Sequence, residues 1–84
     1  MTFETDYEDL VRQIVSRLVM RPEAFVVDSI IVDGKQTIRV QVHHSDLGHV
    51  IGKQGRTVNS IRTILLASSM RGKTKIALEI VNPS

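Results

Sequence analysis

Hydrophobic residues recur at helical spacing near the start of the chain. The spacing is the i, i+3, i+4, i+7 repeat of an amphipathic helix, carried by Tyr7, Leu10, Val11, Ile14 and Leu18. Thr5 followed by Glu8 fits a capping box, and Pro22 ends the segment because proline cannot continue a helix. The pattern predicts a helix from about Asp6 to Met20.

Three later segments have the pattern of strands. Residues 25–32 are rich in β-branched side chains and too short for a typical helix, and the Asp33-Gly34 pair that follows is a hairpin-turn signal. Apolar and polar residues then alternate in two further segments, as in half-buried strands. The apolar positions are Ile38, Val40 and Val42 in the first, and Ile76, Leu78 and Ile80 in the second.

Two more helices are expected between the second and third strands. Ser45 can cap a short helix that runs through Ile51, and a longer helix runs from about Arg56 to Met70. The buried face of the longer helix is expected to hold Val58, Ile61, Ile64 and Leu65. Leu66 and Met70 fall outside this face. We take the first helix to cover them, with a dimer contact as the alternative.

The element order is therefore α-β-β-α-α-β, an α+β fold. Strands that each have one apolar face need helices to cover that face, so we expect a three-stranded mixed sheet covered on one face by three helices. The connection between the second and third strands is long enough for a right-handed crossover, which lets these strands lie parallel. The second strand is then central.

Length and composition indicate one small domain. The 84 residues, 42% of them hydrophobic, can form a single core, and we assign residues 1–84 to one domain with residues 1–4 as a flexible tail. No apolar run approaches the roughly 20 residues of a membrane span. The first residues are acidic and lack the order of a signal peptide. We therefore expect a cytoplasmic protein.

The charges are divided unevenly along the chain. Residues 1–51 hold five Lys or Arg and eight Asp or Glu, whereas residues 52–84 hold six basic residues and one acid, Glu79. Positive charge thus begins at one point and continues to the end. Most charge runs are solvated faces, but this one coincides with a glycine loop, which favours a surface that binds a polyanion.

That loop, Gly52-Lys53-Gln54-Gly55, is the most informative segment of the sequence. Glycine lets the backbone approach a ligand closely and take conformations that other residues avoid. The helix that follows offers free N–H groups and a positive dipole end, and Lys53 and Arg56 add two positive charges. The spacing alone also fits a glycine-capped corner between two helices. The longer pattern, Val-Ile-Gly-Lys-x-Gly-Arg followed by apolar residues three apart, favours a clamp for phosphates.

Other functions have less support. A metal or catalytic site could use only His43, His44, His49 and Asp46, and His43 and His44 are expected to point to opposite faces of a strand end, so we predict no metal site, no cofactor and no enzyme activity. The glycine segment lacks the spacing of a Walker loop. Nucleic-acid readers that stack bases on aromatic platforms need more aromatic residues than Phe3, Tyr7 and Phe25.

With these residues in view, the whole chain resembles the KhpA (YlqC) family of small bacterial single-KH-domain RNA-binding proteins, of the type II KH fold. The resemblance is carried by residues 46–57 and 61–65. His49 departs from it, because the family often has a basic residue there.

The resemblance implies binding of single-stranded RNA and a role as an RNA chaperone or post-transcriptional regulator. Gly52, Lys53, Gln54 and Gly55 would hold the sugar-phosphate backbone beside Arg56. Val50, Ile51 and Val58 would form the apolar side of the groove, or else belong to the core. Arg71 and Lys73 would supply the opposite rim. The family also implies homodimers and heterodimers with a KhpB-like KH protein, so an assembly module in which RNA binding is secondary is the alternative function.

Overall fold

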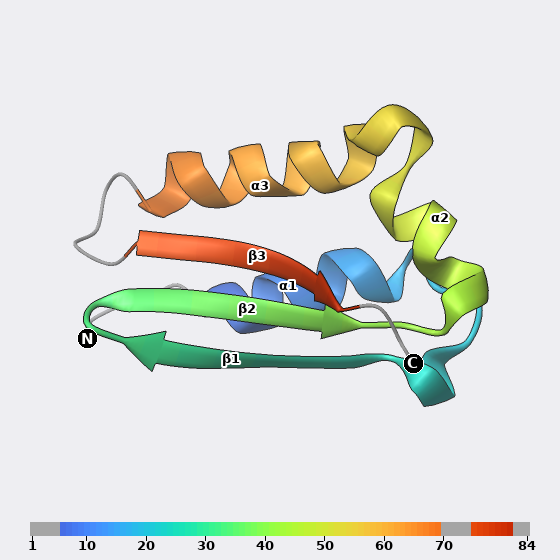
Figure 1. Ribbon diagram of the computed structural model, residues 1–84, viewed down its shortest axis with the longest axis horizontal. Coiled ribbons are helices and arrows are strands. Elements are labelled where there is room, and N and C mark those ends of the chain that lie inside the picture. Colours follow the sequence, from blue (N-terminus) through green and yellow to red (C-terminus); the bar gives the residue numbers. More distant parts are fainter. Residues whose placement is uncertain (1–5, 70–74, 82–84) are drawn as a thin grey trace.

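The computed structural model describes residues 6–69 and 75–81. Within these residues the order of helices and strands is the predicted α-β-β-α-α-β, with three single-turn 3-10 helices (η) between them (Figure 1). The elements are α1 (Tyr7–Ser16), η1 (Pro22–Ala24), β1 (Val26–Val32), β2 (Lys35–Gln41), η2 (His44–Asp46), α2 (Leu47–Ile51), η3 (Lys53–Gly55), α3 (Arg56–Ser69) and β3 (Lys75–Val81). The expected tail, residues 1–4, lies outside the described residues.

The described sheet has the strand order β1-β2-β3. β1 and β2 pair antiparallel, and Asp33 and Gly34 join them with φ values of 51° and 76°, the two positive φ angles that a tight hairpin turn requires. β2 and β3 pair parallel, so that Ile38 lies beside Leu78. The predicted mixed sheet with a central second strand is confirmed.

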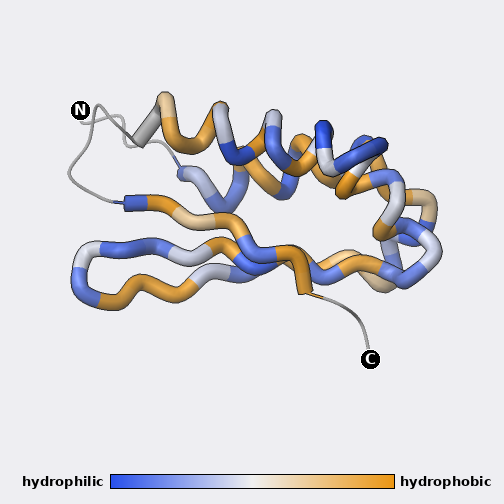
Figure 2. The backbone as a smooth tube through the Cα atoms, turned by 45° about the horizontal axis from the view of Figure 1, so that its top comes forward, coloured by the Kyte–Doolittle hydropathy of each residue, from blue (hydrophilic) through white to orange (hydrophobic). Residues whose placement is uncertain are grey.

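The core lies between one face of the sheet and the helices (Figures 1 and 2). Ile38, Val40 and Val42 are all buried, as their alternation predicts. The helices contribute Val11, Val15, Val50, Val58, Ile61 and Leu65. Ile64 is 48% exposed, so its predicted place on the buried face is wrong. Leu66 is 61% exposed, so α1 does not cover it. Met70 lies outside the described residues.

Helix α1 is shorter at its C-terminal end than the periodicity predicts. At its start, Asp6 caps the helix by accepting a hydrogen bond from the Asp9 N–H at 3.1 Å, whereas Thr5 lies outside the described residues. The helix ends at Ser16 rather than near Met20. The N–H groups of Met20 and Arg21 instead donate to the Asp46 carboxylate, at 3.0 Å each. The following segment is therefore held by a residue far away in the sequence.

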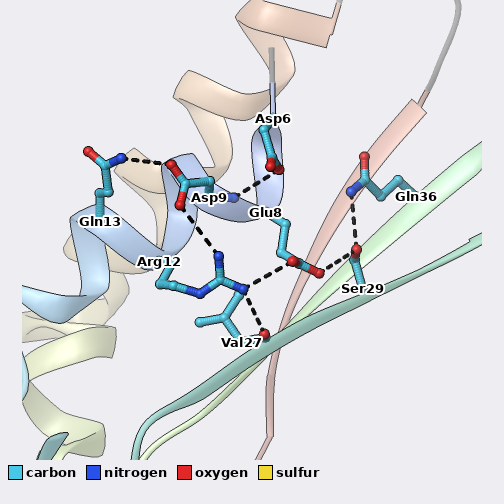
Figure 3. Close-up of polar contacts among 8 residues, drawn as sticks. All are labelled: Asp6, Glu8, Asp9, Arg12, Gln13, Val27, Ser29 and Gln36. Carbon is cyan, nitrogen blue, oxygen red and sulfur yellow. Dashed lines mark hydrogen bonds and ion pairs between the residues drawn. The ribbon is translucent and has the colours of Figure 1, made fainter. Parts of the chain in front are cut away.

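Polar contacts attach α1 to the sheet (Figure 3). Glu8 accepts from the Ser29 hydroxyl of β1 at 2.8 Å and from Arg12 at 3.0 Å. Arg12 also donates to the main-chain oxygen of Val27 at 3.1 Å, and Gln36 of β2 donates to Ser29 at 3.3 Å. These bonds satisfy polar groups where the sheet and helix meet. None of the helices in the described residues is long and apolar enough to cross a membrane.

Candidate nucleic-acid interface

The glycine loop connects α2 to α3 and depends on Gly52. The N–H of Gly52 donates to the Gly48 oxygen at 2.8 Å and closes α2. Gly52 has φ 78° and ψ 172°, a region open essentially to glycine alone. A Cβ there would also collide with the Thr57 side chain and lie 2.8 Å from the Thr57 nitrogen. Both the dihedral angles and the space therefore require glycine at this position.

The next residues form a concave turn of the main chain. Gln54 and Gly55 have φ values of 58° and 75°, and Arg56 returns to the right-handed helical region at −64°. The Gly55 N–H donates to the Gly52 oxygen at 3.1 Å and holds the turn closed. The Arg56 N–H donates to the Lys53 oxygen, so the turn is held by two main-chain hydrogen bonds. A left-handed non-glycine residue such as Gln54 is uncommon and tends to occur at functional sites.

The loop and α3 carry uncompensated positive charge. Lys53, Gln54 and Arg56 are exposed. Residues 52–69 contain Lys53, Arg56 and Arg62 and no Asp or Glu. In the described part of the chain, none of these three cations forms an ion pair, whereas Arg12, Arg21 and Arg39 are each paired with a carboxylate. Side-chain charge and the dipole of α3 therefore both favour an anion near the loop.

The apolar residues around the loop divide into two groups. Val50 and Val58 were expected either in the apolar side of the groove or in the core. They are 0% and 5% exposed, so they belong to the core. They support the loop from beneath. Ile51, the last residue of α2, is 37% exposed and is available beside the loop. The predicted rim residues Arg71 and Lys73 lie outside the described residues.

Two hollows flank α3. One lies between α3 and β3, the strand at the edge of the described sheet, and has a volume of about 300 Å³. The other lies along the outer face of α3, from Arg56 to Ile64, with about 470 Å³. The first hollow lies between α3 and the edge of the sheet, on a side of the helix where no residue of the loop lines it.

Asp46 is a buried residue whose role the sequence does not reveal. It is 1% exposed, and its two carboxylate oxygens accept the N–H groups of Met20 and Arg21. Burial acts to raise the pKa of Asp46. These two hydrogen bonds, together with the electrostatic influence of His49 and His43, outweigh burial and hold the pKa below its ordinary value. Asp46 thereby ties the α1–β1 connection to the start of α2.

The histidines of this region differ from the prediction. β2 ends at Gln41, before both His43 and His44, and their rings lie 4.2 Å apart rather than on opposite faces. The predicted capping role of Ser45 is wrong as well, because the Nδ1 atom of His43 accepts the Ser45 N–H at 3.1 Å. Among the described residues, no group of three or more His, Cys, Asp or Glu could hold a metal ion.

Comparison with known proteins gives one consistent result. The family described as KhpA/KhpB, KH domain matches residues 8–80. A protein of Bacillus subtilis named RNA-binding protein KhpA is 44% identical over 73 residues, 87% of this chain and 90% of the relative. Proteins of the same name from Listeria monocytogenes and Treponema pallidum are 40% and 37% identical, over 88% and 89% of this chain and 97% and 94% of their own. The α-β-β-α-α-β order and mixed sheet are consistent with the type II KH fold.

Proposed function

Because the chain belongs to the KhpA family of single-KH-domain proteins, a family of RNA-binding proteins and not of enzymes, we propose that it binds single-stranded RNA through the Gly52–Gly55 loop. In this proposal the loop and Arg56 hold the sugar-phosphate backbone, and Ile51 offers an apolar contact beside it. Arg71 and Lys73 supply cations to the opposite rim. The protein acts in the cytoplasm as an RNA chaperone or post-transcriptional regulator.

The conformation of the loop is the observation that carries this proposal. A glycine at a strained position with no room for a side chain, a left-handed Gln54 and the unpaired cations Lys53 and Arg56 occur together at the N-terminal end of α3. A plain corner between helices needs one glycine, and it has no need of a left-handed residue between two glycines. Phosphate binding accounts for all of these features at once, because main-chain N–H groups and positive charge are what a phosphate requires.

The double variant Lys53→Asp with Gln54→Asp tests the clamp. Both residues are exposed, and aspartate tolerates the left-handed conformation at position 54, so the melting temperature should barely change. Two negative charges beside the phosphates should weaken binding of a short single-stranded RNA by at least about tenfold. Fluorescence anisotropy with a labelled oligonucleotide measures this loss.

A matched control is available on the uncovered face of the sheet. Lys35→Asp with Gln41→Asp makes the same two chemical changes at exposed positions of β2, and it should leave RNA affinity within about twofold of wild type apart from a general charge effect. Equal losses in both double variants, or full binding by the loop variant in a folded protein, would refute the clamp.

Assembly is the second candidate function, and the outer face of α3 supports it. Ile64 is 48% exposed and borders the hollow formed with Arg56, Asn59, Ser60 and Thr63. Covering the exposed half of this apolar side chain with another chain would remove apolar surface from water, which favours association. We propose that this face mediates a homodimer, or a heterodimer with a KhpB-like KH protein.

Sedimentation velocity over a range of protein concentrations tests this second candidate. Wild type should show a concentration-dependent rise in size, and Ile64→Lys should remain monomeric, because a buried unpaired charge opposes the contact. Ile64 is half exposed, so the variant should keep its fold. A wild-type protein that stays monomeric both alone and with its KhpB-like partner would exclude assembly.

A further inference from the structure

Among the described residues, Arg62 is the one charged side chain that lines the hollow between α3 and β3, and the others are apolar. Leu65 and Leu78, 2% and 8% exposed, form its floor. The full lining is Arg62, Leu65, Leu66, Ile76, Ala77 and Leu78. Its volume of about 300 Å³ is at the lower end of the range for small-molecule sites. An apolar hollow of this size suits one flat ring.

Arg62 reaches across this hollow from helix to strand. Its Nη2 atom donates to the main-chain oxygen of Leu78 at 3.4 Å, which is long for an N–H···O hydrogen bond. A guanidinium group has five N–H donors and no acceptor. Among the described residues, Arg62 forms no ion pair, in contrast to Arg12 and Arg39. Most of its donors are therefore available to a ligand.

The chemistry of the hollow specifies what it accepts. Aliphatic walls contact the face of a ring, and a planar fork of donors pairs with two acceptors that lie side by side. Guanine presents such a pair in O6 and N7, and cytosine presents one in O2 and N3. Adenine and uracil have no such pair: the N6 amino group of adenine lies beside N1 and N7 while N3 stands alone, and the N3–H of uracil lies between its two carbonyl oxygens. Against those bases the guanidinium could form only one of the two parallel bonds, so the bidentate pairing would be lost.

We propose that Arg62 is a specificity-determining residue that selects guanine or cytosine over adenine or uracil at one position of the bound RNA. This proposal rests on the proposed RNA binding and assigns base selection to a different place from the phosphate clamp. The long bond to Leu78 holds the guanidinium in the hollow until a base replaces the carbonyl as its partner. The glycine loop then supplies affinity without regard to sequence, and Arg62 supplies discrimination.

Short RNAs of one length test this assignment. The probes are an oligoadenylate, the same strand with one central guanosine, cytidine or uridine, and an oligouridylate. Wild type should bind the guanosine or the cytidine strand about fivefold more tightly than oligoadenylate. This ratio corresponds to a difference of about 1 kcal/mol in binding free energy between the bases. The comparison of the guanosine and cytidine strands identifies the preferred base.

Two substitutions locate the source of the preference. Arg62→Lys keeps the charge and removes the fork, so the preference should fall below about twofold while affinity for oligoadenylate stays nearly constant. Arg62→Gln should lose the preference in the same way. Arg56→Lys is the matched control at the other arginine of α3 and should retain the preference.

Each outcome decides between the two proposals. Wild-type binding that is equal for all strands, or a preference that survives Arg62→Lys, overturns the role of Arg62 and leaves the phosphate clamp intact. Failure of wild type to bind any strand overturns RNA binding itself, and the role of Arg62 with it.

Discussion

Gly48 lies within α2, and Gly52 follows one helical turn later as the cap of its C-terminal end. A side chain added at these two positions would meet different surroundings. Around Gly48 no described atom lies within 4 Å of an added Cβ, and its backbone is helical. At Gly52 a Cβ would meet Thr57, and φ is 78°. The identity of a residue as glycine is visible in the sequence, but whether its backbone conformation demands glycine is visible only in the structure.

Alanine substitutions at these two glycines should therefore have opposite effects. Gly48→Ala should raise the free energy of unfolding by about 0.5 to 1 kcal/mol, because alanine favours the helix. Gly52→Ala should lower it by about 1 to 3 kcal/mol through the strained backbone conformation and the collision with Thr57. Urea denaturation measures both. Similar values for the two variants would mean that the loop relaxes around a side chain.

At the residue scale, the sequence was sufficient to locate the loop but not to predict which neighbouring residues are buried. The spacing of glycines and cations in residues 52–56 predicted the candidate loop, and the structure has positive φ angles at three of its four residues. Whether Val50 and Val58 face a ligand or the core depends on how α2 and α3 pack, which a local pattern does not contain. Arg62 is one of several basic residues in the sequence, and the contact with Leu78 is what distinguishes it.

At the scale of elements, the position of α2 depends on Asp46. This helix is five residues long and too short to be stable alone. Asp46 precedes it and accepts two N–H groups from the segment that follows α1. The same two bonds explain why α1 stops early. Periodicity predicts the apolar stripe of a helix well, but it cannot locate a helix end that is set by a carboxylate about 25 residues further along the chain.

The lowered pKa of Asp46 makes this link sensitive to acid. The unfolded chain binds the proton at an ordinary pKa of about 3.9, and the folded protein binds it only at lower pH. The stabilisation is therefore complete above the unfolded value and is lost as the pH falls through the folded pKa. The urea midpoint should fall as the pH is lowered below about 5, and more steeply in wild type than in Asp46→Asn.

The comparison with Asp46→Asn is needed because other carboxylates also titrate in this range. Glu8 with Arg12 and Asp28 with Arg39 are paired in the folded state, and both pairs are present in the variant. The difference between the two pH profiles therefore isolates Asp46. Parallel profiles would show that the carboxylate does not contribute through its charge.

At the scale of the whole molecule, the division of charge along the chain becomes a division in space. Glu8 and Asp9 of α1 accept hydrogen bonds from Arg12 and Gln13 of the same helix (Figure 3). Lys53, Arg56 and Arg62, on the loop and α3, form no ion pair with the described residues. The arrangement of strands and helices followed from the alternation of apolar residues and the length of the crossover. The exposure of Ile64 did not, because the helical period does not fix how α3 is rotated against the sheet.

Binding of single-stranded RNA should weaken with salt to a limited extent. Each phosphate contact contributes a slope of about −0.7 to the plot of log affinity against log salt. The candidates Lys53, Arg56, Arg71 and Lys73 imply roughly two to four contacts. Titrations at several salt concentrations measure the slope, and the Lys53→Asp, Gln54→Asp variant should have a smaller one. Affinity that does not depend on salt would contradict a phosphate-facing surface.

The parallel pairing of β2 with β3 also has a consequence for the order of events in folding. The hairpin of β1 and β2 can form early from local contacts, but two strands alone are marginally stable in water. The third strand follows α2, the glycine loop and α3 in the chain. Its pairing with β2 closes a long loop, and the entropy of closing that loop is lost before the strand contacts can stabilise the sheet. On the ribosome, the glycine loop therefore emerges well before the sheet that supports it is complete. We expect a nascent chain to bind RNA only after residues 75–81 have left the exit tunnel.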